Sequence, residues 1–343
     1  MPIFDLPMMR AGSKSRCLLL AFIGSIAACH RIDAAPPARF YRVVDLTANY
    51  SDFFDRTRGM EANSRVAAFK REMDSKFPDF YSRQSAPWLT REQYDASIAH
   101  SFEAFPGIRT QYERKAASFI TMLDPALASF RHVFSDMRPI GDIHLVHSIG
   151  AMDGGTRQLG AANFFIFGAD VMARVHRFDD ETPFFHHELF HVYHRGFFSD
   201  GCEQLWCSLW MEGLAVLAAS TLTPDASDDQ LLLTSPQPIR AKVDSHFVQA
   251  ICAASEKLAS ETPEDYQSFF GGQQLSEALP PRFGYYVGYL IGRESLRSRS
   301  LNELAHLNVA QARPIVEASL LAMAVCPTRK ASASSPAPQR QIP

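Results

Sequence analysis

Residues 182–195, TPFFHHELFHVYHR, combine four histidines and one glutamate with mostly aromatic and apolar neighbours. Histidine and glutamate suit a packed helix interior poorly unless something pairs with them. His187, Glu188 and His191 form the pattern H-E-x-x-H, in which two imidazoles four residues apart lie on one helix face and can bind one ion. Imidazole nitrogens suit zinc, and Glu188, one residue along, can take a proton from a water beside the ion.

A catalytic zinc site needs a third protein ligand. His194 and Phe197 occupy the positions where the extended metzincin pattern requires glycine and a ligand, and the inverted order H-x-x-E-H is absent. Glu212, in LWMEGLAVLA, stands in an otherwise apolar helical stretch, where an unpaired carboxylate is costly. The intervening segment is long enough to turn, so His187, His191 and Glu212 are the predicted ligands of Zn²⁺.

The other histidines have weaker claims to a role. His194 shares the helix face of His187, which allows a place at the rim of a cleft, but a surface histidine near a helix end is the favoured reading. His186 points elsewhere and is expected to be structural. His144 and His147 are expected to be hydrogen-bonded residues in or near a sheet.

His187, Glu188, His191 and the sequence EGLA that starts at Glu212 resemble the gluzincins, the zinc metallopeptidases that include thermolysin and the aminopeptidase-N-like enzymes. The chain is similar to predicted zinc-dependent proteases of bacteria over roughly residues 140–300. The resemblance implies a thermolysin-like catalytic domain with these three zinc ligands and Glu188 as general base. Val216 departs from it, because thermolysin has there an aspartate that orients a zinc-bound histidine. No exopeptidase motif precedes His187.

Residues 280–294, PPRFGYYVGYLIGRE, are similar to a segment that follows the glutamate helix in these proteases. A hydrolytic site needs a hydrogen-bond donor for the oxyanion. The candidates are Tyr285, Tyr286, Tyr289 and Arg282, of which we select Tyr286. The same resemblance implies that the strand NFFIFGADV runs beside the cleft as an edge and pairs with extended substrate.

Residues 1–28 have the form of an export signal, with a basic stretch followed by an apolar run too short to span a bilayer. The ending IAAC resembles the bacterial lipobox, in which Cys29 becomes the lipidated first residue; cleavage after Ala35 is the alternative. Both routes predict a protein of the periplasm or cell envelope, and lipidation predicts attachment to a membrane, such as the outer membrane. Four later cysteines predict one or two disulfides with three pairings open: Cys202, Cys207, Cys252 and Cys326.

The composition predicts a globular protein. The 343 residues are 46% hydrophobic, carry a formal net charge of −3 and contain no long block of like charge. These values exclude a general polyanion binder, so nucleic acid is not an expected partner, and they say nothing of oligomeric state.

Periodicity predicts the order of elements. Residues 61–137 are helical in pattern, with breaks expected at Pro78, Pro87, Pro106 and Pro125. Two strands are expected, in DIHLVHSIG and ANFFIFGADVM, with the glycine-rich MDGGTRQLG as the loop between them. Helices are then expected over about 182–196, 203–223, 241–259, 283–298 and 300–324.

The predicted fold class is α+β, with a zincin-like metallopeptidase domain over 139–327 that has a small sheet, the active-site helices and a mainly helical C-terminal part. A signal (1–28), a linker (29–58) and a helical region (59–138) precede it, and a disordered tail (328–343) follows. The predicted function is that of an exported zinc metallopeptidase acting on peptides or proteins. A cell-envelope binding or assembly lipoprotein without turnover is the alternative, and a zinc hydrolase of a non-peptide amide in the cell wall is a third hypothesis.

Overall fold

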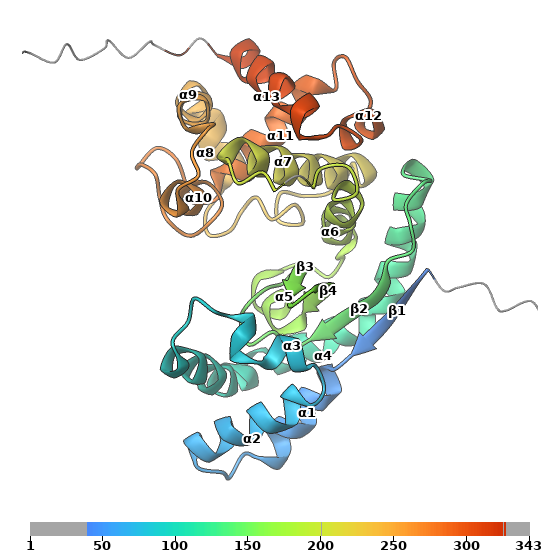
Figure 1. Cartoon of the computed structure of the whole chain (residues 1–343), viewed down its shortest axis with the longest axis vertical. Helices are drawn as coiled ribbons and strands as arrows, with labels where there is room; N and C mark the ends of the chain where they lie inside the picture. The colour runs from blue at the N-terminus through green and yellow to red at the C-terminus, as the bar shows by residue number, and fades with distance from the viewer. Residues whose placement is uncertain (1–39, 200, 325, 327–343) are drawn as a thin grey trace, which may run out of the picture. The chain divides into compact units, whose positions relative to one another are not determined.

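The computed structural model describes residues 40–199, 201–324 and 326, and within them a small mixed sheet stands among many helices. The strand order is β1-β2-β4-β3. The pairs β1–β2 and β2–β4 are parallel, and β3–β4 is antiparallel (Figure 1). The strands are β1 (Tyr41–Asp45), β2 (Gly141–Val146), β3 (Gly154–Leu159) and β4 (Ala162–Gly168). The expected α+β class is confirmed, whereas the signal, Cys29 and the tail after residue 327 lie outside the described residues.

Two of these strands differ from the expectation. The glycine-rich segment expected to be a loop is β3, and β1 lies inside the expected linker. Neither strand has a clean alternation of apolar and polar residues in its sequence: β3 is GGTRQL and β1 is YRVVD. Their conformation is set by pairing with β4 and β2, which no local pattern reveals. β4 ends at Gly168, and the residues after it form α5 (Ala169–Val175).

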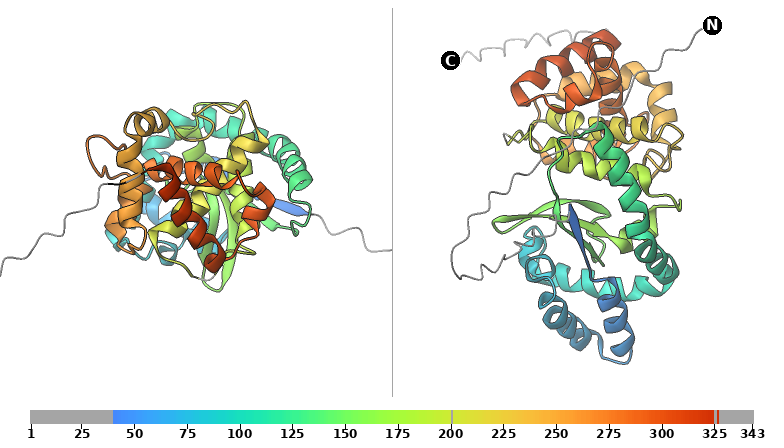
Figure 2. Two further views of the ribbon diagram at one scale, coloured as in Figure 1. Left: turned by 90° about the horizontal axis from the view of Figure 1, so that it is seen from above. Right: turned by 90° about the vertical axis from the view of Figure 1, so that its right-hand side faces the viewer.

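The N-terminal helices include one much longer than expected. Pro106 and Pro125 lie inside α4 rather than ending helices. Each proline removes one helical hydrogen bond, and Figure 2 shows α4 changing direction along its length. Burial of Phe102, Phe105 and Phe119 along the helix offsets that cost. The elements here are α1 (Thr47–Arg56), α2 (Ala62–Asp74), α3 (Pro78–Tyr81), the 3₁₀ turn Arg83–Ser85 and α4 (Arg91–Val133).

The C-terminal part is helical, and the two helices expected to carry the ligands are confirmed as α6 (Thr182–His194) and α7 (Leu205–Leu222). The pattern over 241–259 forms two helices, the pattern over 300–324 also forms two, and α10 was not expected. The remaining helices are α8 (Ile239–Ser245), α9 (Phe247–Lys257), α10 (Pro263–Phe269), α11 (Phe283–Ser295), α12 (Leu301–Ala305) and α13 (Val309–Met323). Helix α7 has the length and hydropathy of a membrane span, but 67% of it is buried inside the protein, as in a core helix.

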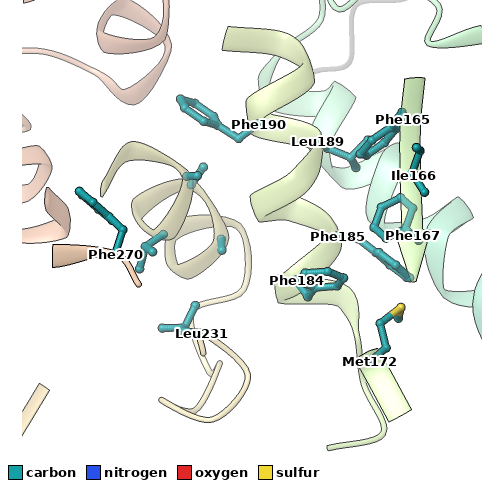
Figure 3. Packing of buried hydrophobic residues seen from close by; sticks show 14 of the residues in the cluster. Phe165, Ile166, Phe167, Met172, Phe184, Phe185, Leu189, Phe190, Leu231 and Phe270 are labelled. Atoms are coloured by element: carbon teal, nitrogen blue, oxygen red, sulfur yellow. The ribbon is translucent and has the colours of Figure 1, made fainter. Parts of the chain in front are cut away.

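Aromatic packing fixes the rotation of α6 on the sheet. Phe184 and Phe185 make edge contacts with Phe167 of β4, at ring-centroid distances of 5.8 and 5.5 Å. Figure 3 shows Phe185 and Leu189 lying between α6 and β4. Because this face of the helix is committed to the core, His187 and His191 are turned toward α7.

The cysteines are paired as Cys202–Cys207 and Cys252–Cys326, which selects one of the three open pairings. The first bridge joins the α6–α7 connection to the first turn of α7. The second joins α9 to the chain just after α13. Both bridges therefore tie the ends of C-terminal helices to their neighbours.

Candidate metal centre

Helices α6 and α7 bring the three predicted ligands together. The Nε2 atoms of His187 and His191 are 3.1 Å apart. Glu212 Oε2 lies 3.4 Å from Nε2 of His187 and 3.3 Å from Nε2 of His191. The three side chains are 15–22% exposed, so the cluster is sheltered and still reachable. Within the described part of the chain, these residues form a His/Glu group suited to one metal ion.

The spacing of these donors fits zinc. Ligand atoms roughly 2.0–2.2 Å from a tetrahedral zinc ion lie about 3.3–3.6 Å from one another. The donor separations of 3.1–3.4 Å are close to these values. Two imidazoles and one carboxylate also form the donor set of a catalytic zinc site that keeps one position for solvent or substrate. The residues therefore fit Zn²⁺ in both geometry and chemistry.

The Glu212 carboxylate favours a positive charge between the three side chains. Burial disfavours charge on His191, but the adjacent Glu212 carboxylate outweighs burial and raises the pKa of His191 to about 9. Burial would raise the pKa of Glu212, yet the neighbouring imidazoles hold it below its usual range. A proton or a divalent cation can supply this charge, and metal binding displaces the proton.

Glu188 lies beside the cluster without belonging to it. It lines the same pocket and is 7% exposed, and burial raises the pKa of its carboxyl to about 8. The start of β3 makes room for it. A Cβ on Gly154 would lie 2.7 Å from Phe184 Cζ and 3.1 Å from Glu188 Cγ, so only glycine fits against this carboxylate.

The pocket over the cluster is a cavity of about 350 Å³. Its walls come from the first residues of β3, the length of α6, one face of α7 and the segment 230–232. Arg282 and Tyr285, at the start of α11, complete it. The site is therefore a space between the sheet edge and the helices, large enough for a few residues of a peptide.

The structure does not bring Tyr286, the selected oxyanion donor, to this pocket. Its hydroxyl donates to Asp244 at 3.0 Å, the Arg240 guanidinium lies 4.8 Å from its ring centroid, and the side chain is buried away from the ligands. Tyr285 lines the pocket instead, with its ring centroid 6.5 Å from that of His187. The selection of Tyr286 was wrong because successive helix residues differ in direction by about 100 degrees, and the sequence placed the start of α11 correctly but not the face that it turns toward α6 and α7.

The strand beside the pocket also differs from the expectation. β4 lies between β2 and β3, so it has no free edge, and β3 is the edge strand next to the pocket. Gly154, Gly155 and Thr156 of β3 line the cavity. An extended peptide can therefore pair with β3, not with β4.

A buried chain of charges reaches the pocket, and sequence reasoning missed it. Lys115 Nζ lies 2.5 Å from Glu181 Oε1, and Glu181 Oε2 lies 2.8 Å from His176 Nδ1. His176 Nε2 lies 3.3 Å from Asp153 Oδ2, and Asp153 lines the pocket. The first three side chains are at most 3% exposed, and Asp153 is 31% exposed. Only His176 and Glu181 are close in the sequence, and the four residues carry no motif that could have identified them.

The four other histidines considered in the sequence analysis are buried. His194 is 2% exposed between Phe190 and Phe198 and lines the pocket, so the surface reading was wrong; burial lowers its pKa to about 3. His186 is structural as expected, with contacts to hydroxyls on α4 and after α7. His147 accepts a backbone hydrogen bond within the sheet region as expected, whereas His144 stacks on the Phe77 ring and its buried Nδ1 has no hydrogen-bond partner among the described residues.

No protein-family model matches this chain, and no curated protein or solved structure is detectably similar to it. The argument for a function therefore rests on the geometry of the site.

Proposed function

We propose that this protein is a zinc-dependent peptidase of the gluzincin type with a zincin-like catalytic domain. His187, His191 and Glu212 hold Zn²⁺, and Glu188 is the general base. The observation that carries the proposal is the near-tetrahedral spacing of the three donor atoms. The buried carboxyl of Glu188 lies beside them in the same pocket. The two disulfides agree with an exported protein, and lipid attachment through Cys29 remains a prediction.

Each group in the pocket has a separate role in the proposed hydrolysis. Zinc supplies Lewis acidity to the reacting oxygen atoms. Glu188 accepts a proton from the attacking water and passes it to the leaving amine. Tyr285, which lines the pocket with its ring centroid 6.5 Å from that of His187, donates a hydrogen bond to the developing oxyanion. The free edge of β3 pairs with the substrate backbone, which keeps the cleaved bond above the ligands.

The test combines metal analysis with a peptide-library digest. We expect about one zinc per chain and cleavage that a chelator abolishes. Glu188→Gln retains zinc and loses about 10²–10⁴-fold in rate, because only the proton acceptor is removed. Glu92→Gln, on the first turn of α4 and outside the pocket, is the matched control and cleaves like the parent.

Three outcomes would each contradict a part of this proposal. A Glu188→Gln variant that cleaves at the parental rate removes Glu188 from the reaction. Bound zinc without chelator-sensitive cleavage of any peptide supports a binding or assembly protein of the cell envelope instead. Activity confined to amides of the cell wall supports the non-peptide hydrolase.

A further inference from the structure

Arg282 places a positive charge at the pocket wall that the described residues leave without a carboxylate partner. Its Nη1 donates to the carbonyl of Ser235 at 3.1 Å, and its guanidinium lies 4.8 Å from the ring centroid of Tyr285. By contrast, two carboxylates of the pocket are already matched: Asp153 by His176, and Glu212 by the two imidazoles. The half-buried guanidinium therefore remains available to an anion that enters from outside.

The backbone at Arg282 is one that arginine rarely adopts. Its φ of 65° and ψ of 13° lie in the left-handed region, where a residue other than glycine is strained by about 1–2 kcal/mol. Arg282 is also the N-cap of α11, a 13-residue helix whose N-terminus adds positive potential. The helix terminus adds to the positive potential of the guanidinium, which favours a bound anion at this point of the pocket.

Tyr285 links Arg282 to the metal ligands. The Tyr285 ring centroid is 4.8 Å from the guanidinium and 6.5 Å from the ring of His187. These two steps span no more than about three residues of extended chain, at roughly 3.5 Å each. A group held by Arg282 thus belongs to the part of a bound peptide next to the cleaved bond.

We propose that Arg282 binds a carboxylate of the substrate, so that the site prefers peptides with a negative charge within about three residues of the cleaved bond. Guanidinium and carboxylate match as two parallel, charge-assisted hydrogen bonds. This inference rests on the proposed peptidase function and adds its substrate class. The carboxylate is either a free C-terminus or an acidic side chain, and the experiment separates these two sources.

The probe is a set of fluorescent hexapeptides of one sequence, bound to the zinc-loaded Glu188→Gln protein and followed by fluorescence anisotropy. One pair differs only in a free or amidated C-terminus. A second, amidated series carries Asp or Asn at successive positions. We expect one source of carboxylate to bind about tenfold tighter or more than its neutral counterpart.

Variants of Arg282 test whether the preference for carboxylate peptides comes from its guanidinium. Arg282→Gln and Arg282→Gly abolish it, and Arg282→Lys keeps part of it. The glycine variant also relieves the left-handed backbone, so loss of charge is not confused with misfolding. Arg293→Gln is the matched control, because Arg293 lies on the same helix near the Tyr289 ring and outside the pocket. It keeps the full preference.

Equal binding of charged and neutral peptides, a preference that survives in Arg282→Gly, or binding by none of the peptides overturns the proposal. Cleavage by the parent protein is measured separately. A parent that binds carboxylate peptides through Arg282 and cleaves none of them overturns the peptidase and leaves the anion site standing. A parent protein that cleaves charged and neutral peptides equally well overturns the anion site and leaves the proposed peptidase function standing.

Discussion

Gly213 and Gly288 bring the backbones of α7 and α11 into direct contact. A Cβ on Gly213 would lie 2.1 Å from the carbonyl carbon of Gly288, and a Cβ on Gly288 would lie 2.2 Å from the Leu209 carbonyl oxygen. Glu212 directly precedes Gly213, and Tyr285 lies about one turn before Gly288. The contact therefore sets the distance between the ligand carboxylate and the tyrosine on the opposite wall.

Gly213→Ala is expected to lower the free energy of unfolding by about 1–3 kcal/mol or more, because the added methyl group meets backbone that cannot move aside. Urea unfolding measures the loss. Gly107→Ala is the control: Gly107 also lies in a helix, and its Cβ would meet nothing within 4 Å. That change should stabilise by roughly 0.5–1 kcal/mol. Equal effects at the two positions would contradict the close contact.

Tyr285→Phe is expected to lower kcat for peptide cleavage by about 10²–10³-fold with little change in KM, because an oxyanion donor acts mainly in the transition state. Tyr286→Phe should retain most activity, since the Tyr286 hydroxyl bonds Asp244 away from the pocket. Steady-state kinetics of both variants check this. The reverse order of effects would restore Tyr286 as the candidate donor.

Buried His186 makes stability fall with acid. Burial lowers its pKa from 6.5 to about 4, so the folded protein keeps this imidazole neutral where the unfolded chain protonates it. The neutral His186 imidazole therefore contributes fully to the free energy of unfolding above pH 6.5. This contribution declines as the pH falls toward 4, by up to roughly 3 kcal/mol. Unfolding measured across this window should show a weaker pH dependence in His186→Gln. His100→Gln, with its side chain 74% exposed in the parent, should leave the slope unchanged.

Lys115→Met should destabilise the fold by about 3–5 kcal/mol, because Glu181 then remains buried without its ammonium partner. Adding Glu181→Gln should recover part of the loss, since the unmatched charge is removed. A double-mutant cycle by urea unfolding measures this coupling. Strictly additive effects would show that the two groups do not depend on one another.

The ligand cluster was predictable because its determinants are local. The spacing of His187 and His191 sets their common face on α6, and the apolar surroundings of Glu212 mark a carboxylate that needs a partner. Helix periodicity and a connection of suitable length were enough to place these three side chains together. The structure confirms both helices and brings the three side chains together.

The walls of the pocket depend on long-range pairing and were not predictable. β3 becomes a strand by pairing with β4, and Asp153 reaches His176 only after that pairing is made. Tyr285 and Tyr286 are neighbours in sequence, and only the seating of α11 on α7 decides which one faces the ligands. Pro106 lies within a helix because aromatic burial along α4 outweighs the local break.

The three proposed ligands come from two consecutive helices, whereas β1 and β2 pair across most of the N-terminal region. Contacts close in sequence form faster than contacts that must first close a long loop. The pair α6 and α7 can therefore assemble before the sheet, and under the proposed function an ion captured at that stage would favour the correct pairing of these two helices. Refolding with and without zinc should then differ in the early helical phase, while the later closure of the sheet proceeds at the same rate.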